Sequence, residues 1–472
     1  MDTARHGTIG ALAANRPLLI SVVFAFGLTA LAVTGFIRES SALTVSDFAI
    51  NAFFALAAPA LIARFAPPKL VNRLIYVLAI STVLIVGSIY APGVSPKAFA
   101  AFAPSVSAVQ IACVLLIWFV LLRPLVGDIV GLGVAAPVAA VLGAFGASGF
   151  LALEAAPGEG VIGAIASLSL ALSCLVGVGV AADFAQAFAR GGDVHDAAGV
   201  AAYNATSAAV YATLITFGVF VAGLLPAAET INWSFRAIIY GAAGVALAVT
   251  TTLLVTASAL SLAQVSEQTA VTENHRRQNV RRWWRPLRQA LPPSSALAFV
   301  AILMIITVTG LFTAYEPITL VKVALLIACA LFAGLTFVSI RTGIYVFTAL
   351  LSAMVIVRWI YEIAGTPSPS LLAELTGLAV TAALYGQVAI AWRDARNPSR
   401  NAREAAERAM IDGAHRYAIS AAFVLGALFV SDVSGLWSDG AEAAFYTFAM
   451  TLFGFLIAAP LMTAISAVFG RE

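Results

Sequence analysis

GVIGAIASLSLALSCLVGVGVAADFAQA, residues 160–187, decides the class of fold, because it is a long apolar run with one charged side chain, Asp183. A helix needs about 20 consecutive apolar residues to cross the hydrocarbon core of a bilayer. The run is long enough, and a short polar linker, RGGDVHDAA at 190–198, follows it. It therefore predicts a transmembrane helix with an acid near its polar end.

The composition of the whole chain extends this prediction to most of its length. Of the 472 residues, 61% are hydrophobic and only 10% are charged, and the mean hydropathy is +0.97. A water-soluble protein of this length could not cover its surface with so few charged side chains. Long apolar runs recur between short polar loops, which indicates helices rather than the alternating strands of about 10 residues in a membrane barrel. The predicted fold class is all-α, a polytopic helical membrane protein.

The apolar runs predict about fourteen transmembrane helices. They are expected near residues 18–37, 47–63, 74–91, 107–122, 125–152, 160–187, 199–225, 234–262, 295–314, 320–340, 342–364, 371–392, 413–431 and 442–468. The first run is too long for the apolar region of a signal peptide, so we expect it to remain as the first span. The outer loops are short, and none is expected to form a binding domain or an enzyme outside the membrane.

The distribution of basic residues predicts the orientation. With the N-terminus inside, the cytoplasmic segments hold most of the arginines, among them Arg64, Arg123, Arg190 and the clusters at 275–288 and 392–416. The basic residues on or near the other side are Arg38, Lys97, Arg236, Lys322 and Arg358. Because cytoplasmic loops are enriched in lysine and arginine, both termini are expected in the cytoplasm. The expected location is a bacterial-type inner membrane or an equivalent.

The placement of cysteine and histidine argues against a bound cofactor. The cysteines lie inside apolar runs, where they act as small hydrophobic residues: Cys113, Cys174 and Cys329. The histidines lie in polar segments: His6, His195, His275 and His415. Haem and similar cofactors inside a membrane usually need intramembrane histidine ligands, so no cofactor and no metal site is expected.

Short repeats occur in the same order in two parts of the chain. IACVLL at 111–116 matches IACALF at 327–332, and the segment 195–225 aligns without gaps with the segment that begins at 403. Two further pairs keep this order: LAVTGF with ITVTGL, and Tyr240 with Tyr446. Alanine-rich helices can resemble one another by chance, but four ordered matches favour an internal duplication.

The duplication predicts two membrane halves joined by a linker. The first half is 1–262 with about eight helices, the basic cytoplasmic linker is 263–294, and the second half is 295–472 with about six helices. Even numbers of helices place both halves in the membrane in the same orientation. We therefore expect two parallel pseudo-repeats around an axis along the membrane normal, with any transport pathway between them.

The motifs of the first half resemble the transmembrane core of the RND superfamily, including its MMPL-type lipid exporters. These motifs are GVGV at 177–180 followed by Asp183, RGGD at 190–193, and a later turn of helix with Thr216 and Gly218. The family also carries an amphipathic cytoplasmic segment between its halves, and residues 275–288 occupy that position. The resemblance implies an exporter with a lipid or other hydrophobic substrate.

The chain departs from the family at two features. Family members usually carry a large extracytoplasmic porter domain after the first helix of each half, and none occurs here, which excludes substrate capture by such domains. Ala181 and Ala182 stand where the proton-relay acids are expected, and Ala391 is aligned with Asp183 in the second half. Asp183 precedes Arg190 by seven residues, about 10 Å along a helix. These departures favour a helix-end role for Asp183 over a relay.

Other ionisable residues near the membrane are candidates for transport, because charge inside a bilayer is costly. Asp128 follows Arg123 and is interpreted as a helix-start acid paired with that arginine or as a carrier. Arg358 and Glu362 lie four residues apart on one helix face, and Glu374 begins the next helix on the same side. This trio could hold an anionic headgroup, form a gate, or be a structural pair at the membrane edge.

The segment HRRQNVRRWWRPLR at 275–288 combines arginine with tryptophan. This pattern is typical of an interfacial segment that binds anionic lipid headgroups, and nucleic acid is not an expected partner beside a membrane. The predicted headgroup ligands are Arg276, Arg277, Arg281, Arg282, Trp283, Trp284, Arg285 and Arg288.

The predicted function is an integral inner-membrane transporter or exporter-like protein for a lipid or hydrophobic substrate, with or without proton coupling. As an alternative, GFIRE at 35–39 and the fourteen helices resemble MOP-type flippases of lipid-linked saccharides. A non-transporting scaffold or accessory subunit is the other alternative, and it implies a protein partner or a homo-oligomer. An enzyme is not expected, since no cluster of His, Asp and Glu has catalytic spacing.

Overall fold

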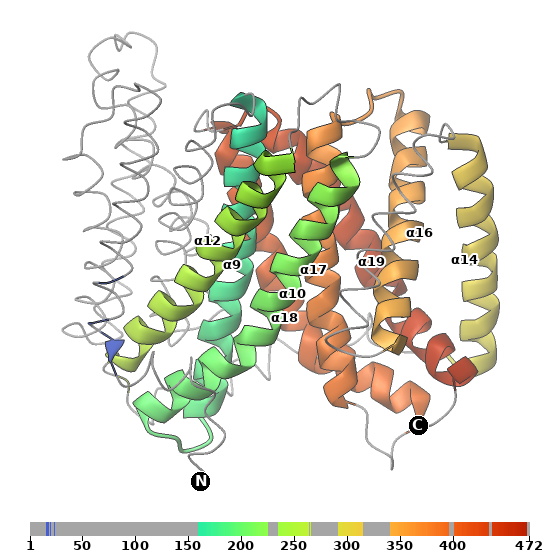
Figure 1. Ribbon diagram of the computed structural model, residues 1–472. Helices are drawn as coiled ribbons and strands as arrows, with labels where there is room; N and C mark the ends of the chain where they lie inside the picture. The colour runs from blue at the N-terminus through green and yellow to red at the C-terminus, as the bar shows by residue number, and fades with distance from the viewer. Residues whose placement is uncertain are drawn as a thin grey trace, which may run out of the picture. The chain divides into compact units, whose positions relative to one another are not determined.

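The computed structural model describes residues 16, 17, 19 and 23 and the ranges 159–224, 235–263, 265, 291–314, 340–395, 401–433 and 437–469 (Figure 1). Within these residues the chain forms helices and turns and no strand. The predicted all-α fold class is therefore confirmed. The helices are α9 Glu159–Phe188, α10 Val194–Leu224, α12 Phe235–Ser261, α14 Pro293–Ala314, α16 Ile340–Ala364, α17 Leu371–Ala395, α18 Ala402–Val433 and α19 Gly440–Phe469.

In the described ranges, six helical stretches are long and apolar enough to cross a membrane. They are Gly163–Phe188, Gly241–Ser261, Pro293–Thr313, Ile340–Ala364, Leu371–Arg393 and Gly440–Phe469, and they fall on six of the spans expected from the sequence. The spans expected at 199–225 and 413–431 coincide with α10 and α18, which are not among these six. The remaining expected spans lie outside the described residues, so the total of fourteen stays a prediction.

The chain divides into two units. The described residues of unit 1 fall within Met1–Ala209, Ala243–Gln278 and Ala422–Ala441, and those of unit 2 within Val210–Ala242, Asn279–Ala421 and Glu442–Glu472. Helices α10, α12, α18 and α19 contribute residues to both units. The predicted division into two halves and a linker stays a prediction.

The connection between α16 and α17 is short and fixed at both ends. Gly365 has a φ of +64°, and the backbone N–H of Thr366 donates to the carbonyl of Tyr361 at 3.1 Å, which is a Schellman motif. Ser370 caps α17, because its Oγ accepts the backbone N–H of Ala373 at 3.2 Å. The two helices therefore form a tight hairpin.

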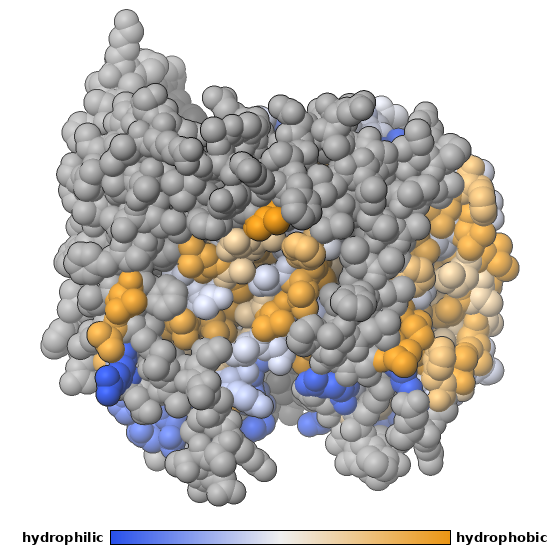
Figure 2. All heavy atoms as spheres, in the orientation of Figure 1, coloured by the Kyte–Doolittle hydropathy of each residue, from blue (hydrophilic) through white to orange (hydrophobic). Residues whose placement is uncertain are grey.

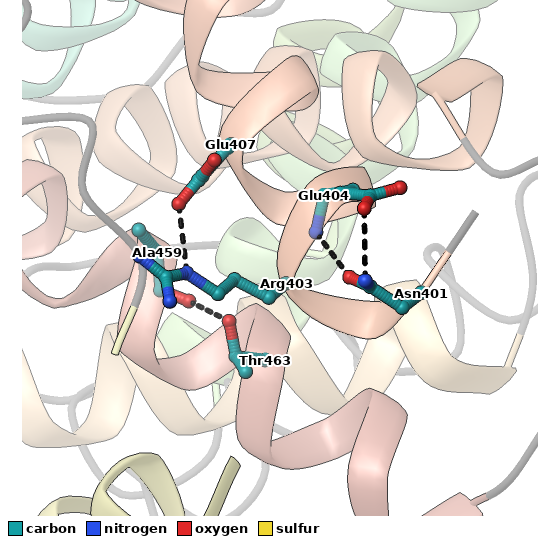
Figure 3. A network of polar contacts seen from close by, with 6 residues as sticks. All are labelled: Asn401, Arg403, Glu404, Glu407, Ala459 and Thr463. Atoms are coloured by element: carbon teal, nitrogen blue, oxygen red, sulfur yellow. Dashed lines mark hydrogen bonds and ion pairs between the residues drawn. The ribbon is translucent and has the colours of Figure 1, made fainter. Parts of the chain in front are cut away.

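Polar side chains fix the start of α18 (Figure 3). Oδ1 of Asn401 accepts the backbone N–H of Glu404 at 2.8 Å, and its Nδ2 donates to the Glu404 carboxylate at 2.9 Å. Within the same turn, Nε of Arg403 donates to the carboxylate of Glu407, which lies one turn later, at 2.9 Å. The first of these contacts satisfies a backbone N–H that the first turn of a helix leaves open, and the other two join side chains of neighbouring turns.

Helices α10 and α18 begin at aligned positions of the proposed repeat. The first bond of α10 runs from the N–H of Ala197 to the carbonyl of Asp193 at 2.8 Å, and that of α18 from Ala405 to Asn401 at 3.0 Å. The alignment that starts at 195 and 403 pairs these residues directly. The two helices thus begin at equivalent positions, and the duplication stays a prediction.

Helix α14 packs against α16, and α16 packs against α17 within unit 2 (Figure 1). Oγ1 of Thr307 lies 3.1 Å from Oγ of Ser352, which joins α14 to α16 by a buried hydrogen bond. One turn further, a Cβ on Gly310 would collide with Val355 and lie about 3 Å from the Trp359 ring. The glycine therefore lets the two helices approach closely, as small residues do between membrane helices.

The other faces of α14 are exposed and apolar. Figure 2 shows hydrophobic residues over the region that α14 occupies in Figure 1. Its large exposed side chains are Leu297, Phe299, Ile302, Ile305, Val308 and Phe312. In a polytopic membrane protein such a surface faces the hydrocarbon of the bilayer, where it costs no hydrophobic free energy.

Tyrosine side chains rest on glycine backbone at three helix contacts of unit 2. A Cβ added to the glycine would collide with the tyrosine at each contact: Tyr211 on Gly386, Tyr385 on Gly454, and Tyr446 on Gly377. The first joins α10 to α17, and the other two join α17 to α19. Dispersion attraction needs close contact between atoms. Because the hydrophobic effect contributes little to helix association in a bilayer, these close contacts are central to the packing of this unit.

A buried arginine also joins the start of α16 to the end of α19. Nη2 of Arg341, at the start of α16, donates to the carbonyl of Phe469 at the end of α19 at 3.0 Å. Arg341 is 6% exposed. A positive side chain at a helix C-terminus pairs with open carbonyls and with the negative end of the helix dipole.

Gly386→Ala is expected to lower stability, because the new methyl group must displace the Tyr211 ring. Overpacking of this kind costs about 1–3 kcal/mol. The midpoint of thermal unfolding in detergent, followed by size-exclusion chromatography, should fall by several degrees. Gly179→Ala is the matched control, since a Cβ at Gly179 meets no atom within 4 Å. Equal midpoints for the two variants would contradict the packing role of the Tyr211 contact.

Arg341→Gln is expected to lower the free energy of unfolding by about 1.5–3 kcal/mol, the usual contribution of a hydrogen bond to a charged group. Thermal unfolding of the two variants Arg341→Gln and Arg358→Gln measures the difference. Arg358 is a matched arginine in the same helix, but its side chain is 27% exposed and its ion pair is partly solvated. The decrease in the free energy of unfolding should be clearly smaller for Arg358→Gln than for Arg341→Gln.

Candidate functional site

Asp183 lies inside α9, five residues before the last residue of the helix, Phe188. It is 7% exposed, so its carboxyl group belongs to a buried part of the helix. Phe184 and Phe188 stack on the adjoining face with ring centroids 6.0 Å apart. Asp183 is thus a buried acid in the last turns of a candidate membrane span, and its role in transport stays a prediction.

Open space lies beside the backbone of α9 one turn before Asp183. Gly179 is buried, yet among the described residues a Cβ placed on it would meet no atom within 4 Å. Residues four apart in a helix share a face, so this space and Asp183 lie on the same side of α9. The GVGV motif therefore places free volume next to the acid.

The same helix face becomes polar and exposed toward its end. Gln186 follows Asp183 by three residues and is exposed, whereas Arg190 is exposed in the turn two residues after the end of α9. The face thus runs from an exposed amide to a buried carboxyl group and then to Gly179.

The RGGD motif forms the turn between α9 and α10. Gly191 has a φ of +85°, which favours glycine, and its N–H donates to the carbonyl of Phe188 at 3.0 Å. The carbonyl of Asp193 then accepts the first backbone bond of α10. The motif is therefore explained by local chain geometry, without any ligand.

The aligned part of α17 is neutral. Asp183 is aligned with Ala391, and the same alignment places Gln387 opposite Gly179. Oε1 of Gln387 is buried and has no hydrogen-bond partner among the described residues. At these aligned positions the described part of the chain carries one acid rather than a pair.

Arg358 and Glu362 lie on one face of α16, as their spacing predicts. Nε of Arg358 is 3.5 Å from Oε1 of Glu362, and the side chains are 27% and 49% exposed. Glu374 lies in the first turn of α17, where a negative charge is favoured by the helix dipole. Exposure and helix-start geometry together agree with a structural role for these three residues, and a gate or headgroup site stays a prediction.

The other sequence candidates lie outside the described residues. These are Asp128 and the headgroup ligands Arg276, Arg277, Arg281, Arg282, Trp283, Trp284, Arg285 and Arg288. Within the ranges that the structure covers, no group of three or more His, Cys, Asp and Glu residues could hold a metal ion. Cys174 is a buried free thiol.

A cluster of buried aromatic residues in unit 2 was not anticipated from the sequence. The hydroxyl of Tyr385 donates to the carbonyl of Met450 at 2.6 Å, and that of Tyr417 to the carbonyl of Thr451 at 2.8 Å. Tyr345 meets the ring of Trp392 edge-on at 6.0 Å, and Tyr211 lies on Gly386. The available signal was tyrosine beside glycine in an apolar run, as in LYGQ at 384–387.

No family model matches the chain, and no curated protein matches its sequence. Two crystal structures of SecDF match its fold. SecDF in its Super-membrane-facing form has a TM-score of 0.50 at 11% identity, over 77% of this chain and 62% of the SecDF chain. SecDF from Thermus thermophilus, described as a translocon-associated membrane protein, has a TM-score of 0.48 at 12% identity over the same shares.

The chain thus spans less than two thirds of the SecDF chain that it matches. At 11% identity the likeness concerns the fold alone. SecDF is a membrane protein of the RND superfamily. The protein is therefore a multi-pass helical membrane protein whose fold resembles that of SecDF.

Proposed function

We propose that this protein is a membrane transporter-like protein that moves a lipid or another hydrophobic substrate. The observation that carries the proposal is the buried carboxyl group of Asp183 beside the open space at Gly179. An ionisable group in a candidate membrane span is costly and is retained where it serves transport or binding. The RND-like fold supports the same class of function.

The apolar surface of the described helices favours a hydrophobic substrate. Besides α14, helix α19 exposes a stripe of large side chains at intervals of three or four residues: Phe445, Phe448, Leu452 and Leu456. A substrate dissolved in the bilayer reaches such helices by lateral diffusion and needs no soluble capture domain. We propose that the protein lies in a bacterial-type inner membrane, with both of its termini in the cytoplasm.

A second candidate is an accessory subunit or scaffold that does not transport. Ala391 favours it, because the position of the second half that is aligned with Asp183 holds alanine rather than an acid. Proton coupling in the proposed transporter would then depend on Asp183 alone. Under either candidate, the basic segment 275–288 is proposed to bind anionic lipid headgroups, with no nucleic acid partner.

The test is the movement of a fluorescent phospholipid between leaflets of vesicles that contain the full-length protein and a pH gradient. Asp183→Asn is expected to slow gradient-dependent movement about tenfold or more, since the loss of a charged contact of about 1.5–3 kcal/mol corresponds to such a factor. Glu407→Gln is the matched control, because this carboxylate is 32% exposed in an intrahelical pair with Arg403. It should leave the movement unchanged.

Three other outcomes would revise the proposal. Unchanged movement in Asp183→Asn would remove this acid from the mechanism. Movement that is insensitive to the gradient would support transport without proton coupling. No movement with the purified chain, together with a stable protein that purifies with it, would favour the accessory subunit.

A further inference from the structure

Helices α9 and α17 place a polar side chain on the same face but at different positions. In α9, Gly179 is followed one turn later by Asp183, and the residues aligned with them in α17 are Gln387 and Ala391. Residues four apart share a helix face, so each pair lies on one side of its helix. The polar residue stands second in α9 and first in α17.

The residues near these positions are similar in the two helices. Phe184 is aligned with Trp392, and both aromatic side chains are 0% exposed. Ser173 is aligned with Thr381, and both hydroxyl-bearing residues are also 0% exposed. The surroundings are thus alike in kind, which justifies a direct comparison of Gly179 with Gln387.

Gln387 shows what kind of group the position of Gly179 can hold. Its side chain consists of two methylene groups and a terminal amide, whose Oε1 atom is buried. At Gly179, by contrast, a Cβ would meet no atom of the described residues within 4 Å. A ligand at Gly179 therefore matches the side chain of Gln387 if it has a two-carbon chain that ends in a polar group.

Asp183 determines the chemistry of that polar group. Side chains of a helix point back toward its N-terminus, so Asp183 points toward the turn that holds Gly179. A carboxylate accepts about four hydrogen bonds, so it can bind a donor in addition to its contacts within the chain. A buried carboxylate is stabilised most by a positively charged donor. The group that fits is a primary ammonium.

The depth of Asp183 favours a lipid as the source of this ammonium. The candidate span Gly163–Phe188 has 26 residues and is about 39 Å long, close to the full thickness of a bilayer with its headgroups. Asp183 precedes Phe188 by five residues, or about 7.5 Å, which is the depth where headgroups meet the hydrocarbon core. Gln186, one turn nearer the end, is exposed.

We propose that Gly179 and Asp183 form a binding site for the ethanolamine headgroup of a phospholipid. The ammonium donates to the carboxylate of Asp183, and the two methylene groups of the headgroup lie beside Gly179. In α17 the side chain of Gln387 takes the corresponding place. As a statement of the substrate class, the site rests on the proposed function, but binding of the lipid requires no transport.

Native mass spectrometry of the full-length protein in detergent, titrated with phospholipids, tests the site. The probes are phosphatidylethanolamine, phosphatidylcholine, whose nitrogen has no N–H donor, and phosphatidylglycerol, which has no positive charge. Asp183→Asn removes the charge, and Gly179→Gln introduces the side chain of the second half. The controls are Glu407→Gln, at an exposed ion pair, and Ala298→Gln, which adds the same side chain at an exposed position of α14. Thermal unfolding shows whether each variant is folded.

Phosphatidylethanolamine is expected to bind about tenfold more tightly than the other two lipids, since it alone offers a charged donor. Asp183→Asn and Gly179→Gln should each weaken its binding about tenfold, and the controls should not. Equal affinities for phosphatidylethanolamine and phosphatidylcholine, or unchanged binding in folded Gly179→Gln, would overturn the site. Free ethanolamine that binds as tightly as the lipid would overturn the lipid source.

Lipid movement in vesicles separates this site from the proposed function. Selective binding of phosphatidylethanolamine without any movement would support the site and contradict transport. Movement that depends on Asp183 but shows no preference among the three headgroups would support transport and contradict the site.

Discussion

The close approach of helices at glycine is the constraint on which the described packing of unit 2 depends. In a bilayer, lipid chains compete with protein for every apolar surface, so helices associate through close contact and polar bonds. Tyrosine on glycine supplies both, because the missing Cβ admits the ring and the hydroxyl can reach a neighbouring backbone. At Tyr385 the hydroxyl reaches the carbonyl of Met450, and at Tyr211 it reaches no partner in the described residues.

The structure changes the interpretation of Asp183. From the sequence it is a polar residue close to a helix end. In the structure α9 continues beyond it, its side chain is buried, and the open space at Gly179 lies on its face. The aligned position in the second half holds Ala391, so the repeat does not reproduce this acid.

The membrane spans were predictable because their signal is local. A run such as 342–364 is long and apolar in any context, and α16 and α17 stop and start at Gly365 and Ser370 through contacts within a few residues. The tyrosine cluster depends on residues as distant in sequence as Tyr211 and Gly386, and no periodicity connects them. The same holds for Arg341, whose hydrogen bond reaches the carbonyl of Phe469, 128 residues away in the sequence.

The hairpin of α16 and α17 is held at both of its ends. The Schellman turn and the Ser370 cap close one end, and Arg341 ties the other to the terminus of α19. Helices α16, α17 and α19 are therefore connected at both ends of the hairpin, so that bending one of them must displace the other two. Helix α10 is joined to these helices at α17 by the Tyr211 ring on Gly386 and by none of the three fastenings at the ends of the hairpin.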